Sequence, residues 1–279
     1  MRPITIPSNI RQLWNADSNG PEENIELINQ RYKSLLNGTP EVSVVIPAYN
    51  EEKNILRTLL SLSSNTTKRS VEIIVVNNNS KDNTEALVKA TGVICITETK
   101  QGITAARNAG LAIARGKYVL NADADSIYPP DWIEEMATPL ADGNNTSITY
   151  GRFAFIPTGN TSRFSYFFYE EIADTIRWIN KMFREEAVNV YGFNSGFRRV
   201  EGLDVNGFDH PPGSNEDGWM AVKLRDKGFG KLYCVNNVTA MVWTADRRIE
   251  MDGGLWKALF KRVKRILFPS KKIVIRKDL

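Results

Sequence analysis

Four short runs of β type, separated by segments with helical spacing, occupy the first half of the chain and limit the folds it can adopt. The runs are rich in Val and Ile and span 42–46, 71–76, 93–97 and 118–120. Strands that alternate with helices, such as the one expected at 104–114, indicate βαβ units. We therefore expect an α/β fold with a mostly parallel central sheet flanked by helices. In such sheets ligands bind at the carboxyl ends of the strands, here in the loops after Ile46, Val76 and Leu120.

The pattern divides the chain into three parts. Residues 1–40 are polar and rich in Asn, and we expect an N-terminal extension there. Residues 41–250 form the main domain, in which 41–126 carry the alternating pattern and 127–250 are less regular. Residues 251–279 form a basic tail. Three helices are expected outside the alternating series, at 22–36, 163–183 and 217–227.

The charge of the chain is unevenly distributed. Of the formal +4, residues 257–279 hold nine Lys or Arg and one acid, a net +8, which leaves 27 minus 31, or −4, for 1–256. A domain that tracks nucleic-acid phosphates needs a basic face, so no nucleic-acid partner is expected. Neither a signal-like apolar run in 1–20 nor a stretch of about 18 uncharged apolar residues occurs. A cytoplasmic location is the expectation.

The basic tail has the pattern of an amphipathic helix. Basic side chains surround an apolar stripe, which consists of Leu255, Trp256, Leu259, Phe260, Val263, Ile266 and Leu267. Such a helix can lie on the anionic inner face of a membrane, which makes peripheral membrane contact through 255–279 one reading. A terminal helix that packs on the domain, with its lysines in water, is the other.

Two acids, Asp123 and Asp125, come directly after the fourth predicted strand. Separated by one residue in extended backbone, they would point to the same side. Carboxylate oxygens are the ligands that Mg²⁺ and Mn²⁺ prefer, commonly together with substrate phosphates. A divalent metal site is therefore one interpretation, and a plain strand end followed by a turn is the other.

The loop after the first strand excludes one class of enzyme. Residues 47–52, Pro-Ala-Tyr-Asn-Glu-Glu, have neither the glycines of a dinucleotide fingerprint nor a P-loop lysine, so hydride transfer is disfavoured. Tyr49 is placed where a base could stack, and Asn50 could cap the following helix, whose amino end favours anions. A packed tyrosine before an ordinary helix fits the spacing equally well.

Five ordered motifs together resemble the family 2 glycosyltransferases. They are Pro47–Glu52, Val75–Ser80, Gly102 with Ala106–Gly110, Gly116–Tyr118 leading to Asp123 and Asp125, and Asn215–Asp217. The resemblance covers about 42–250 and implies a GT-A fold, a Rossmann-like sheet with a nucleotide-binding half at 41–126 and an acceptor-binding, catalytic half at 127–250. It also implies transfer of a sugar from a nucleotide-diphosphate donor, with inversion, to a saccharide or lipid-linked acceptor.

The resemblance further implies roles for single residues. Asp125, helped by Asp123, would hold Mn²⁺ or Mg²⁺ against the donor diphosphate, and Asp217 would be the general base, with Glu216 at the donor sugar or the acceptor. The residues that would contact the donor are Pro47, Ala48, Tyr49, Glu51, Asn77, Lys100, Arg107, Asp123 and Asn194. Many family members have, at the position of Asn77, an acid that often reads the uracil ring. Because an Asn can both donate and accept a hydrogen bond, UDP stays the first choice of nucleotide, with GDP and dTDP left open.

The role implied for Asp217 agrees with the chemistry of an inverting sugar transfer. Inversion needs a carboxylate that takes the acceptor proton, a cation beside the leaving diphosphate, and positioning. Alternatively Ser214 and Asp217 form a Ser-x-x-Asp capping pattern. Of nearby groups, His210 is expected to be an exposed loop residue rather than a ligand, and Arg247 and Arg248 to be surface charges rather than diphosphate ligands.

The sequence also bears on processivity and leaves two alternative functions open, a sugar-nucleotide transferase and a catalytically silent binding module. The three glutamines, Gln12, Gln30 and Gln101, do not begin the Gln-x-x-Arg-Trp motif of processive relatives, so transfer of a single sugar is expected. A sugar-nucleotide transferase with a related sheet would prefer a Gly-rich, basic loop after the first strand. A catalytically silent module that binds nucleotide sugars is the alternative from a different class.

Overall fold

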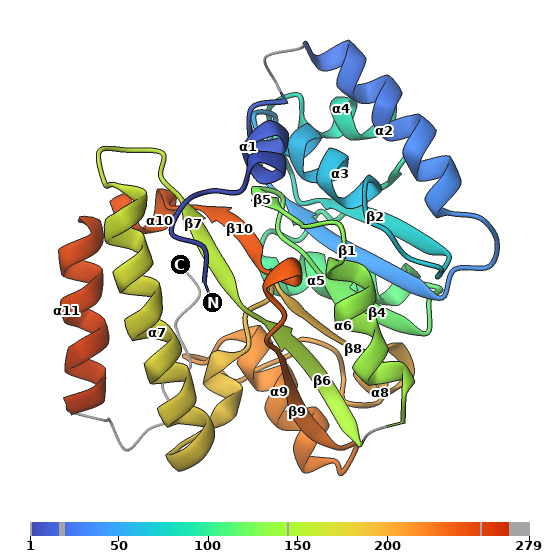
Figure 1. Ribbon diagram of the computed structural model, residues 1–279. Helices are drawn as coiled ribbons and strands as arrows, with labels where there is room; N and C mark the ends of the chain where they lie inside the picture. Colours follow the sequence, from blue (N-terminus) through green and yellow to red (C-terminus); the bar gives the residue numbers. More distant parts are fainter. Residues whose placement is uncertain (1, 17–19, 144, 252, 268–279) are drawn as a thin grey trace.

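The computed structural model describes residues 2–16, 20–143, 145–251 and 253–267, and its centre is a seven-stranded sheet (Figure 1). The strand order is β3-β2-β1-β4-β8-β6-β9. The bounds are β1 Val42–Ala48, β2 Val71–Asn77, β3 Ile94–Thr97, β4 Tyr118–Asn121, β6 Thr146–Gly151, β8 Ser195–Arg198 and β9 Lys231–Val235. Strands β3, β2, β1 and β4 are parallel, β8 is antiparallel to β4 and β6, and β9 is parallel to β6. The expected α/β fold with a mostly parallel sheet is confirmed.

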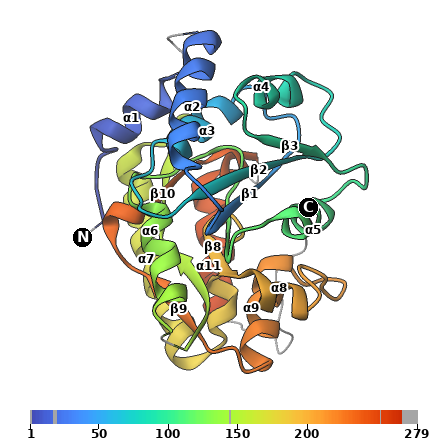
Figure 2. The same ribbon diagram turned by 90° about the vertical axis from the view of Figure 1, so that its right-hand side faces the viewer.

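Helices cover both faces of the sheet (Figure 2). They are α2 Pro21–Leu35, α3 Ile55–Ser63, α4 Thr84–Ala90, α5 Ile103–Ile113, α6 Trp132–Ala141, α8 Arg199–Asp204 and α9 Glu216–Asp226. Successive side chains of β1 point to opposite faces, so Val44 and Ile46 share a buried cluster with Leu59 of α3, whereas Val45 packs with Leu111 of α5. Because β1 is buried on both faces, its sequence is a continuous apolar run, and this run was one of those from which the sheet was predicted.

A second sheet of three strands stands beside the first, in the order β5-β10-β7. Its strands are β5 Ser126–Ile127, β7 Phe153–Ile156 and β10 Val242–Ala245. Helix α1, Ser8–Trp14, contributes Ile10 to the buried cluster of this sheet, with Trp243 of β10. The remaining elements are α7 Arg163–Phe183, α10 Arg247–Met251, α11 Gly254–Leu267 and the 3-10 turns η2 Glu186–Asn189 and η3 Val238–Ala240. Helices α7 and α11 lie side by side at the edge of the molecule (Figure 1).

The described part of the predicted N-terminal extension packs against the rest of the chain. Ile28 of α2 lies in the same buried cluster as β1. Arg2 is buried and forms ion pairs of 3.1 Å with Glu170 and 2.7 Å with Asp174, both on α7. This contact spans more than 160 positions of sequence. The division at residue 40 stays a prediction about domain boundaries.

Two local expectations were wrong. Strand β1 continues through Pro47 to Ala48 rather than ending before the proline. Asn50 does not cap the next helix, which begins at Ile55; it has a positive φ of 54°, a conformation that Asn tolerates better than most residues. The second half, expected to be less regular, contains six of the ten strands in the described residues, most of them too short for a periodic signal and paired in mixed directions.

Candidate functional site

A buried arginine joins the two halves of the main domain. Arg107 on α5 is 2% exposed and lies beside three carboxylates. Its Nη2 is 3.2 Å from Asp123 Oδ1, and its Nε is 3.6 Å from both Glu216 Oε1 and Asp217 Oδ1. Asp123 belongs to the turn after β4, whereas Glu216 and Asp217 begin α9. The cluster therefore brings together four of the residues predicted for the site, from three separate segments.

Asp217 points into this cluster and does not cap its helix. The residue that caps α9 is Asn215, whose side chain accepts a hydrogen bond of 3.2 Å from the Gly218 N–H. The carboxylate of Asp217 instead accepts a bond of 2.6 Å from the Gly192 N–H at Oδ2. Its Oδ1 is buried and has no hydrogen-bond donor among the described residues. The capping alternative for Asp217 is thus excluded, and one oxygen remains to accept a proton.

Gly192 leaves the room that this arrangement needs. A Cβ atom built on Gly192 would lie 2.2 Å from Arg107 Nη2 and 2.3 Å from Asp217 Oδ1. Both distances are far shorter than any non-bonded contact, so every other residue would displace the ion pair. The sequence contains no signal that a missing side chain at Gly192 leaves room for the acid and the arginine to meet.

Burial and charge alter the pKa values of the cluster. Burial raises the pKa of Asp217 to about 8, and the charges of Glu216 and Asp123 also raise it, although Arg107 acts in the opposite direction. For Arg107, burial disfavours the charged form, but the three carboxylates outweigh it and raise the pKa above its ordinary value. A carboxyl group with a pKa near neutrality in a buried cluster is a common feature of acid–base catalysts.

The two acids after β4 lie in a turn rather than in extended backbone. Strand β4 ends at Asn121, and residues 124–125 form the turn that leads into β5. The geometric reason given for a shared direction of Asp123 and Asp125 was therefore wrong. The two carboxylates contact different arginines, since Asp123 reaches Arg107 and Asp125 reaches Arg247.

Tyr128 fixes the backbone of this turn. Its side chain is fully buried, and its hydroxyl accepts a 2.8 Å bond from the Asp123 N–H and donates a 3.0 Å bond to the Phe193 carbonyl. Burial, with the charge of Asp123, raises the pKa of Tyr128 well above its ordinary value, which keeps the hydroxyl protonated and able to donate. The bond also ties the Asp123 turn to the segment that holds Gly192. Tyr128 was not among the residues predicted for the site, because nothing in the sequence distinguishes it from other core tyrosines.

Arg247 lies at the surface but contacts the site. Its Nη2 is 2.5 Å from Asp125 Oδ2 and 2.9 Å from Glu51 Oε1, and its side chain is 43% exposed. The expected surface exposure of Arg247 is confirmed, and its two ion pairs were not part of the prediction. The same guanidinium connects the loop after β1 with the turn after β4.

The loops after β1 and β2 are held together by hydrogen bonds. The Asn50 N–H donates to Ser80 Oγ at 3.0 Å, the Lys81 N–H donates to Asn50 Oδ1 at 2.8 Å, and the Glu51 N–H donates to Thr84 Oγ1 at 2.8 Å. These bonds make one rigid rim from the two loops that were expected to receive the nucleoside.

Two of the residues predicted to contact the sugar-nucleotide donor are buried inside the protein. Asn77 is 2% exposed; its amide donates to Glu85 at 2.8 Å and accepts from the Ser80 N–H at 3.1 Å. Asn194 is 1% exposed and bonds to the Arg152 carbonyl and to Trp132 Nε1, each at 2.8 Å. Each amide therefore supports a loop, and the direct donor contacts expected for both stay predictions.

Other predicted residues lie apart from the Arg107 cluster. Tyr49 is 48% exposed, directly after Pro47 and Ala48, which belong to buried β1. The Lys100 side chain is also exposed, and its backbone carbonyl accepts a 2.8 Å bond from Asn78, a residue that sequence analysis did not select. His210, expected to be exposed, is half-buried and lies 3.2 Å from Thr104 Oγ1.

The described residues contain no ready-made metal cage. No group of three or more His, Cys, Asp or Glu side chains among them is arranged to hold a metal ion. A Mg²⁺ or Mn²⁺ ion bound by one or two carboxylates and completed by substrate phosphates does not require one. The donor set of Asp123 and Asp125 fits that second kind of site.

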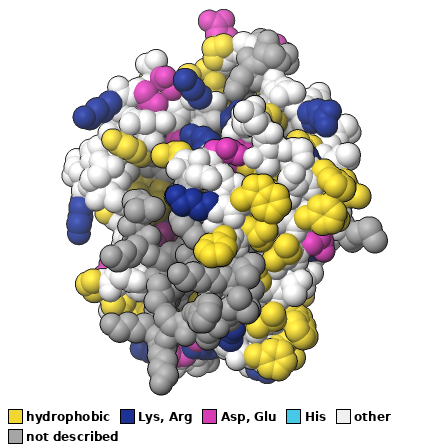
Figure 3. All heavy atoms as spheres, turned by 90° about the vertical axis from the view of Figure 1, so that its left-hand side faces the viewer, with side chains coloured by type: hydrophobic (Ala, Val, Ile, Leu, Met, Phe, Trp, Pro, Cys, Tyr) yellow, Lys and Arg dark blue, Asp and Glu magenta, His cyan; other side chains and the backbone are white. Residues whose placement is uncertain are grey.

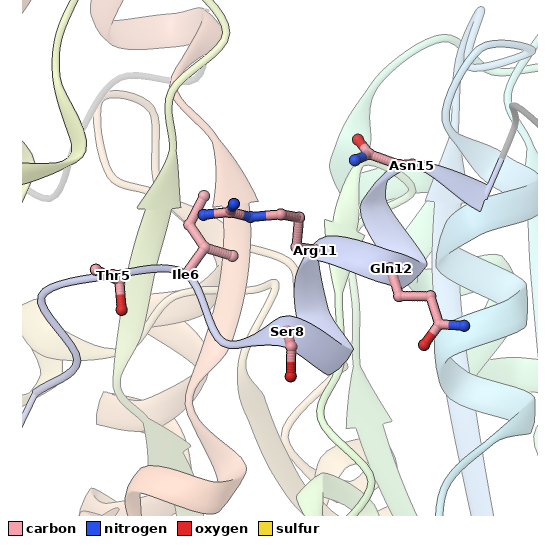
Figure 4. Close-up of a pocket in the computed structure, with 6 residues that line it drawn as sticks. All are labelled: Thr5, Ile6, Ser8, Arg11, Gln12 and Asn15. Atoms are coloured by element: carbon pink, nitrogen blue, oxygen red, sulfur yellow. The ribbon is translucent and has the colours of Figure 1, made fainter.

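One surface hollow has no part in this chemistry. It measures about 470 Å³ and lies on the N-terminal segment around α1 (Figure 4). The side chains that line it are those of Thr5, Ile6, Ser8, Arg11, Gln12 and Asn15, and none of them was predicted for the site.

No helix within the described ranges is long and apolar enough to cross a membrane.

Comparison with known proteins places these observations in a family. The model of glycosyl transferase family 2 matches residues 43–201, more than half of the chain. EpsH of Bacillus subtilis is 33% identical over 128 residues, 44% of this chain and 37% of that protein. The glycosyltransferase AglE of Haloferax volcanii is 32% identical over 131 residues, 44% of this chain and 43% of that protein. The chain thus matches less than half of the length of either relative.

Solved structures share the fold. The mannosyltransferase PcManGT of Pyrobaculum calidifontis, in complex with GDP-Man and Mn²⁺, has a TM-score of 0.58 at 20% identity and covers 91% of this chain and 76% of its own. Staphylococcus aureus TarS 1-349, in complex with UDP-GlcNAc, has a TM-score of 0.55 at 18% identity, with 74% and 58% covered. The GT-A fold is thereby confirmed. With a matching family model, related sequences and this fold, the chain belongs to glycosyl transferase family 2.

Proposed function

We propose that the chain transfers one sugar from a nucleotide-diphosphate donor, a UDP-sugar in the first place, to a saccharide or lipid-linked acceptor with inversion at the anomeric carbon. The observation that carries this proposal is the buried cluster of Arg107 with Asp123, Glu216 and Asp217. It links the turn expected at the donor diphosphate to the carboxylate expected to act on the acceptor. A silent binding module would have no need for a buried acid with a pKa near neutrality.

At the anomeric carbon one bond forms and one breaks, and one proton moves. The acceptor hydroxyl oxygen attacks the anomeric carbon, the bond from that carbon to the diphosphate oxygen breaks, and its electron pair leaves with the nucleoside diphosphate. The proton of the hydroxyl passes to Asp217 Oδ1, the oxygen without a donor in the described structure. Arg107 and the Gly192 N–H hold this carboxylate in place and act as positioning groups.

A divalent metal is proposed at the turn after β4, with Asp125 and Asp123 as its protein ligands. When bound, Mg²⁺ or Mn²⁺ would offset the negative charge that grows on the departing diphosphate. The complexes of PcManGT and of glucosyl-3-phosphoglycerate synthase from Mycobacterium tuberculosis, both with Mn²⁺, support this choice of cofactor. Arg247, beside Asp125, is a second positive group at the same turn.

The donor half offers a stacking surface and an ordered rim. Tyr49 is exposed at the end of β1, and the loop of Asn77 is bonded to the loop of Asn50. We propose that the base lies on Tyr49 and against this rim, with Glu51 and Lys100 near the ribose and diphosphate. The complexes of similar structures contain UDP-GlcNAc in one case and GDP-Man in another. The nucleotide base that this chain prefers therefore has to be measured.

The test is release of nucleoside diphosphate from UDP-, GDP- and dTDP-sugars with Mn²⁺ and with EDTA. We expect turnover with one nucleotide, its loss with EDTA and in Asp125→Ala, and a fall of at least about 10³-fold in acceptor-dependent transfer for Asp217→Asn. Asp226→Asn is the matched control, since Asp226 lies at the other end of α9 with 60% of its side chain exposed. Metal-independent turnover, or full transfer by Asp217→Asn, would remove this mechanism.

A further inference from the structure

Helix α7 has one apolar face that no described residue covers. Side chains at i, i+4 and i+8 lie on the same side of a helix, and Phe164, Phe168 and Ile172 follow this spacing. They are 57%, 52% and 37% exposed. The face continues through Trp178 and Met182, each 57% exposed, to Phe183 at 72%. The exposed rings touch one another, with centroids 4.8 Å apart for Phe164 and Phe168 and 5.8 Å for Trp178 and Phe183.

Helix α11 extends this surface instead of covering it. Its Leu255, Ala258 and Leu259 pack on the cluster that includes Tyr166 and Tyr169 of α7. On its outer side, Trp256 is 82% and Phe260 is 69% exposed. The sequence left open whether the tail packs on the domain or presents apolar groups outward, and these residues of α11 do both. Figure 3, which views this side of the molecule, shows apolar side chains gathered over it.

Two adjacent helices with an apolar face of this extent differ from the scattered exposed side chains of a typical soluble surface. We infer that the outer faces of α7 and α11 form a docking surface for an anionic lipid membrane. The surface consists of Phe164, Phe168, Ile172, Trp178, Met182, Phe183, Trp256 and Phe260.

Charge decides in favour of lipid over a second copy of the chain. Residues 257–279, which begin within α11, carry a net +8, while residues 1–256 carry −4. Exposed aromatic groups that are followed in sequence by a dense basic segment match the headgroup region of an anionic bilayer. The acid on the same side of α7, Glu171, is paired with Arg2 at 3.7 Å, which reduces its repulsion from anionic lipid.

The position of α7 relates this surface to the reaction. The helix ends at Phe183, and the chain then runs through η2 to Gly192, which contacts Asp217. A docked α7 would therefore place the bilayer beside the segment that leads to the acceptor side of the site. This use of the surface rests on the proposed function, whereas lipid binding itself does not.

The experiment measures sedimentation of the full chain with vesicles of phosphatidylcholine alone and with about 30% phosphatidylglycerol. We expect binding to the anionic vesicles that weakens with salt, and little binding to the neutral ones. The double variant Phe168→Ser with Trp178→Ser should raise the apparent Kd at least about tenfold, since each change removes a large apolar group from the contact. Val200→Ser on α8, where Val200 is 72% exposed, is the matched control and should bind as the wild type does.

The outcomes separate this inference from its alternatives. Unchanged vesicle binding by the α7 variant would overturn the docking surface and leave the basic tail as the sole contact. A dimer in sedimentation velocity that the α7 variant splits, with no vesicle binding, would assign the surface to a second copy. Transfer of the sugar to a water-soluble acceptor, followed by release of nucleoside diphosphate, should be the same in both variants and verifies that they fold. Vesicle binding without transfer to any acceptor would refute the proposed function and leave the surface in place.

Discussion

The guanidinium of Arg247 lies between two carboxylates of different loops, 2.5 Å from Asp125 and 2.9 Å from Glu51. A positive charge beside Asp125 lowers the affinity of that carboxylate for a cation, by about 1 kcal/mol at 4 Å in water-like surroundings. We therefore expect Arg247→Ala to bind Mn²⁺, in the absence of nucleotide, about three- to tenfold more tightly than the wild type. Titration of Mn²⁺ followed by electron paramagnetic resonance measures this.

The control for this variant is Arg225→Ala. Arg225 pairs with Glu185 at 2.6 Å, so it is also an arginine in an ion pair, but its partners lie outside the site. It should leave the Mn²⁺ affinity unchanged. Weaker Mn²⁺ binding in Arg247→Ala would mean that Arg247 orders Asp125 instead of competing with the ion.

The pH dependence of transfer should report Asp217. A general base acts in its deprotonated form, and the pKa of Asp217 is raised to about 8. We expect kcat/KM to rise tenfold per pH unit below about pH 8 and to level off above it. Measurement of initial rates from about pH 6 to about pH 9.5 tests this. A rate that is flat across this range would contradict the assignment of Asp217 as the base.

The same raised pKa makes a prediction about stability. Between the ordinary pKa of a carboxyl group and about 8, the folded chain holds a proton on Asp217 that the unfolded chain has released. The free energy of unfolding therefore decreases as the pH rises through this window. Asp217→Asn removes this contribution, so its Tm should fall less steeply than that of the wild type between about pH 6 and pH 8. Parallel Tm curves would show that the pKa of Asp217 is not raised.

Gly192→Ala should disable the site, because its Cβ would occupy the positions of Arg107 Nη2 and Asp217 Oδ1. We expect at least about 10²-fold lower kcat together with a loss of about 1–3 kcal/mol in the free energy of unfolding. Gly159→Ala is the control, since its Cβ would meet Glu250 at an ordinary 3.4 Å. Rate assays and urea unfolding measure the two effects. A Gly192→Ala enzyme of normal rate would show that the ion pair is dispensable.

Tyr128→Phe should loosen the turn that carries both acids. The variant leaves the Asp123 N–H and the Phe193 carbonyl without their shared partner, at a cost of about 1–3 kcal/mol in stability. We expect weaker Mn²⁺ binding as well, which separates a positioning role from a general loss of stability. Tyr150→Phe is the control, because it removes a hydroxyl bonded to Glu186 at 2.8 Å and should lose stability with unchanged Mn²⁺ affinity. Equal Mn²⁺ affinity in both variants would contradict the role of Tyr128.

The sequence was sufficient for features that depend on local pattern. The apolar runs of β1 and β2 predicted the parallel core, and α7 begins and ends where the periodicity placed it. Residues brought together from distant segments were harder to predict. Arg107 and Asp217 were selected one by one through a resemblance, and no pattern indicated that they form a pair across a glycine.

The strands of the second half, unlike its long helix α7, escaped prediction for a physical reason. Strands such as β5 and β8 have two and four residues, too few for a period of two to be recognised. The resemblance implied that Asn77 and Asn194 bind the sugar donor, which stays a prediction, and no pattern indicated that their amides also satisfy buried backbone and side-chain partners. Chemistry of the residue type alone cannot distinguish these roles, since both need a donor and an acceptor in the same place.

The antiparallel strand β8 also determines when the sheet can close. Because β8 lies between β4 and β6, the outer edge of β4 keeps unpaired backbone groups until residues 195–198 have left the ribosome. The parallel block of β1 to β4 is by then long complete in sequence. A nascent chain halted between these points would expose an open strand edge, the kind of surface on which chains aggregate. Pairing of this edge of β4 therefore depends on synthesis beyond residue 198, and pairing of the outer edge of β6 depends on β9 at Lys231–Val235.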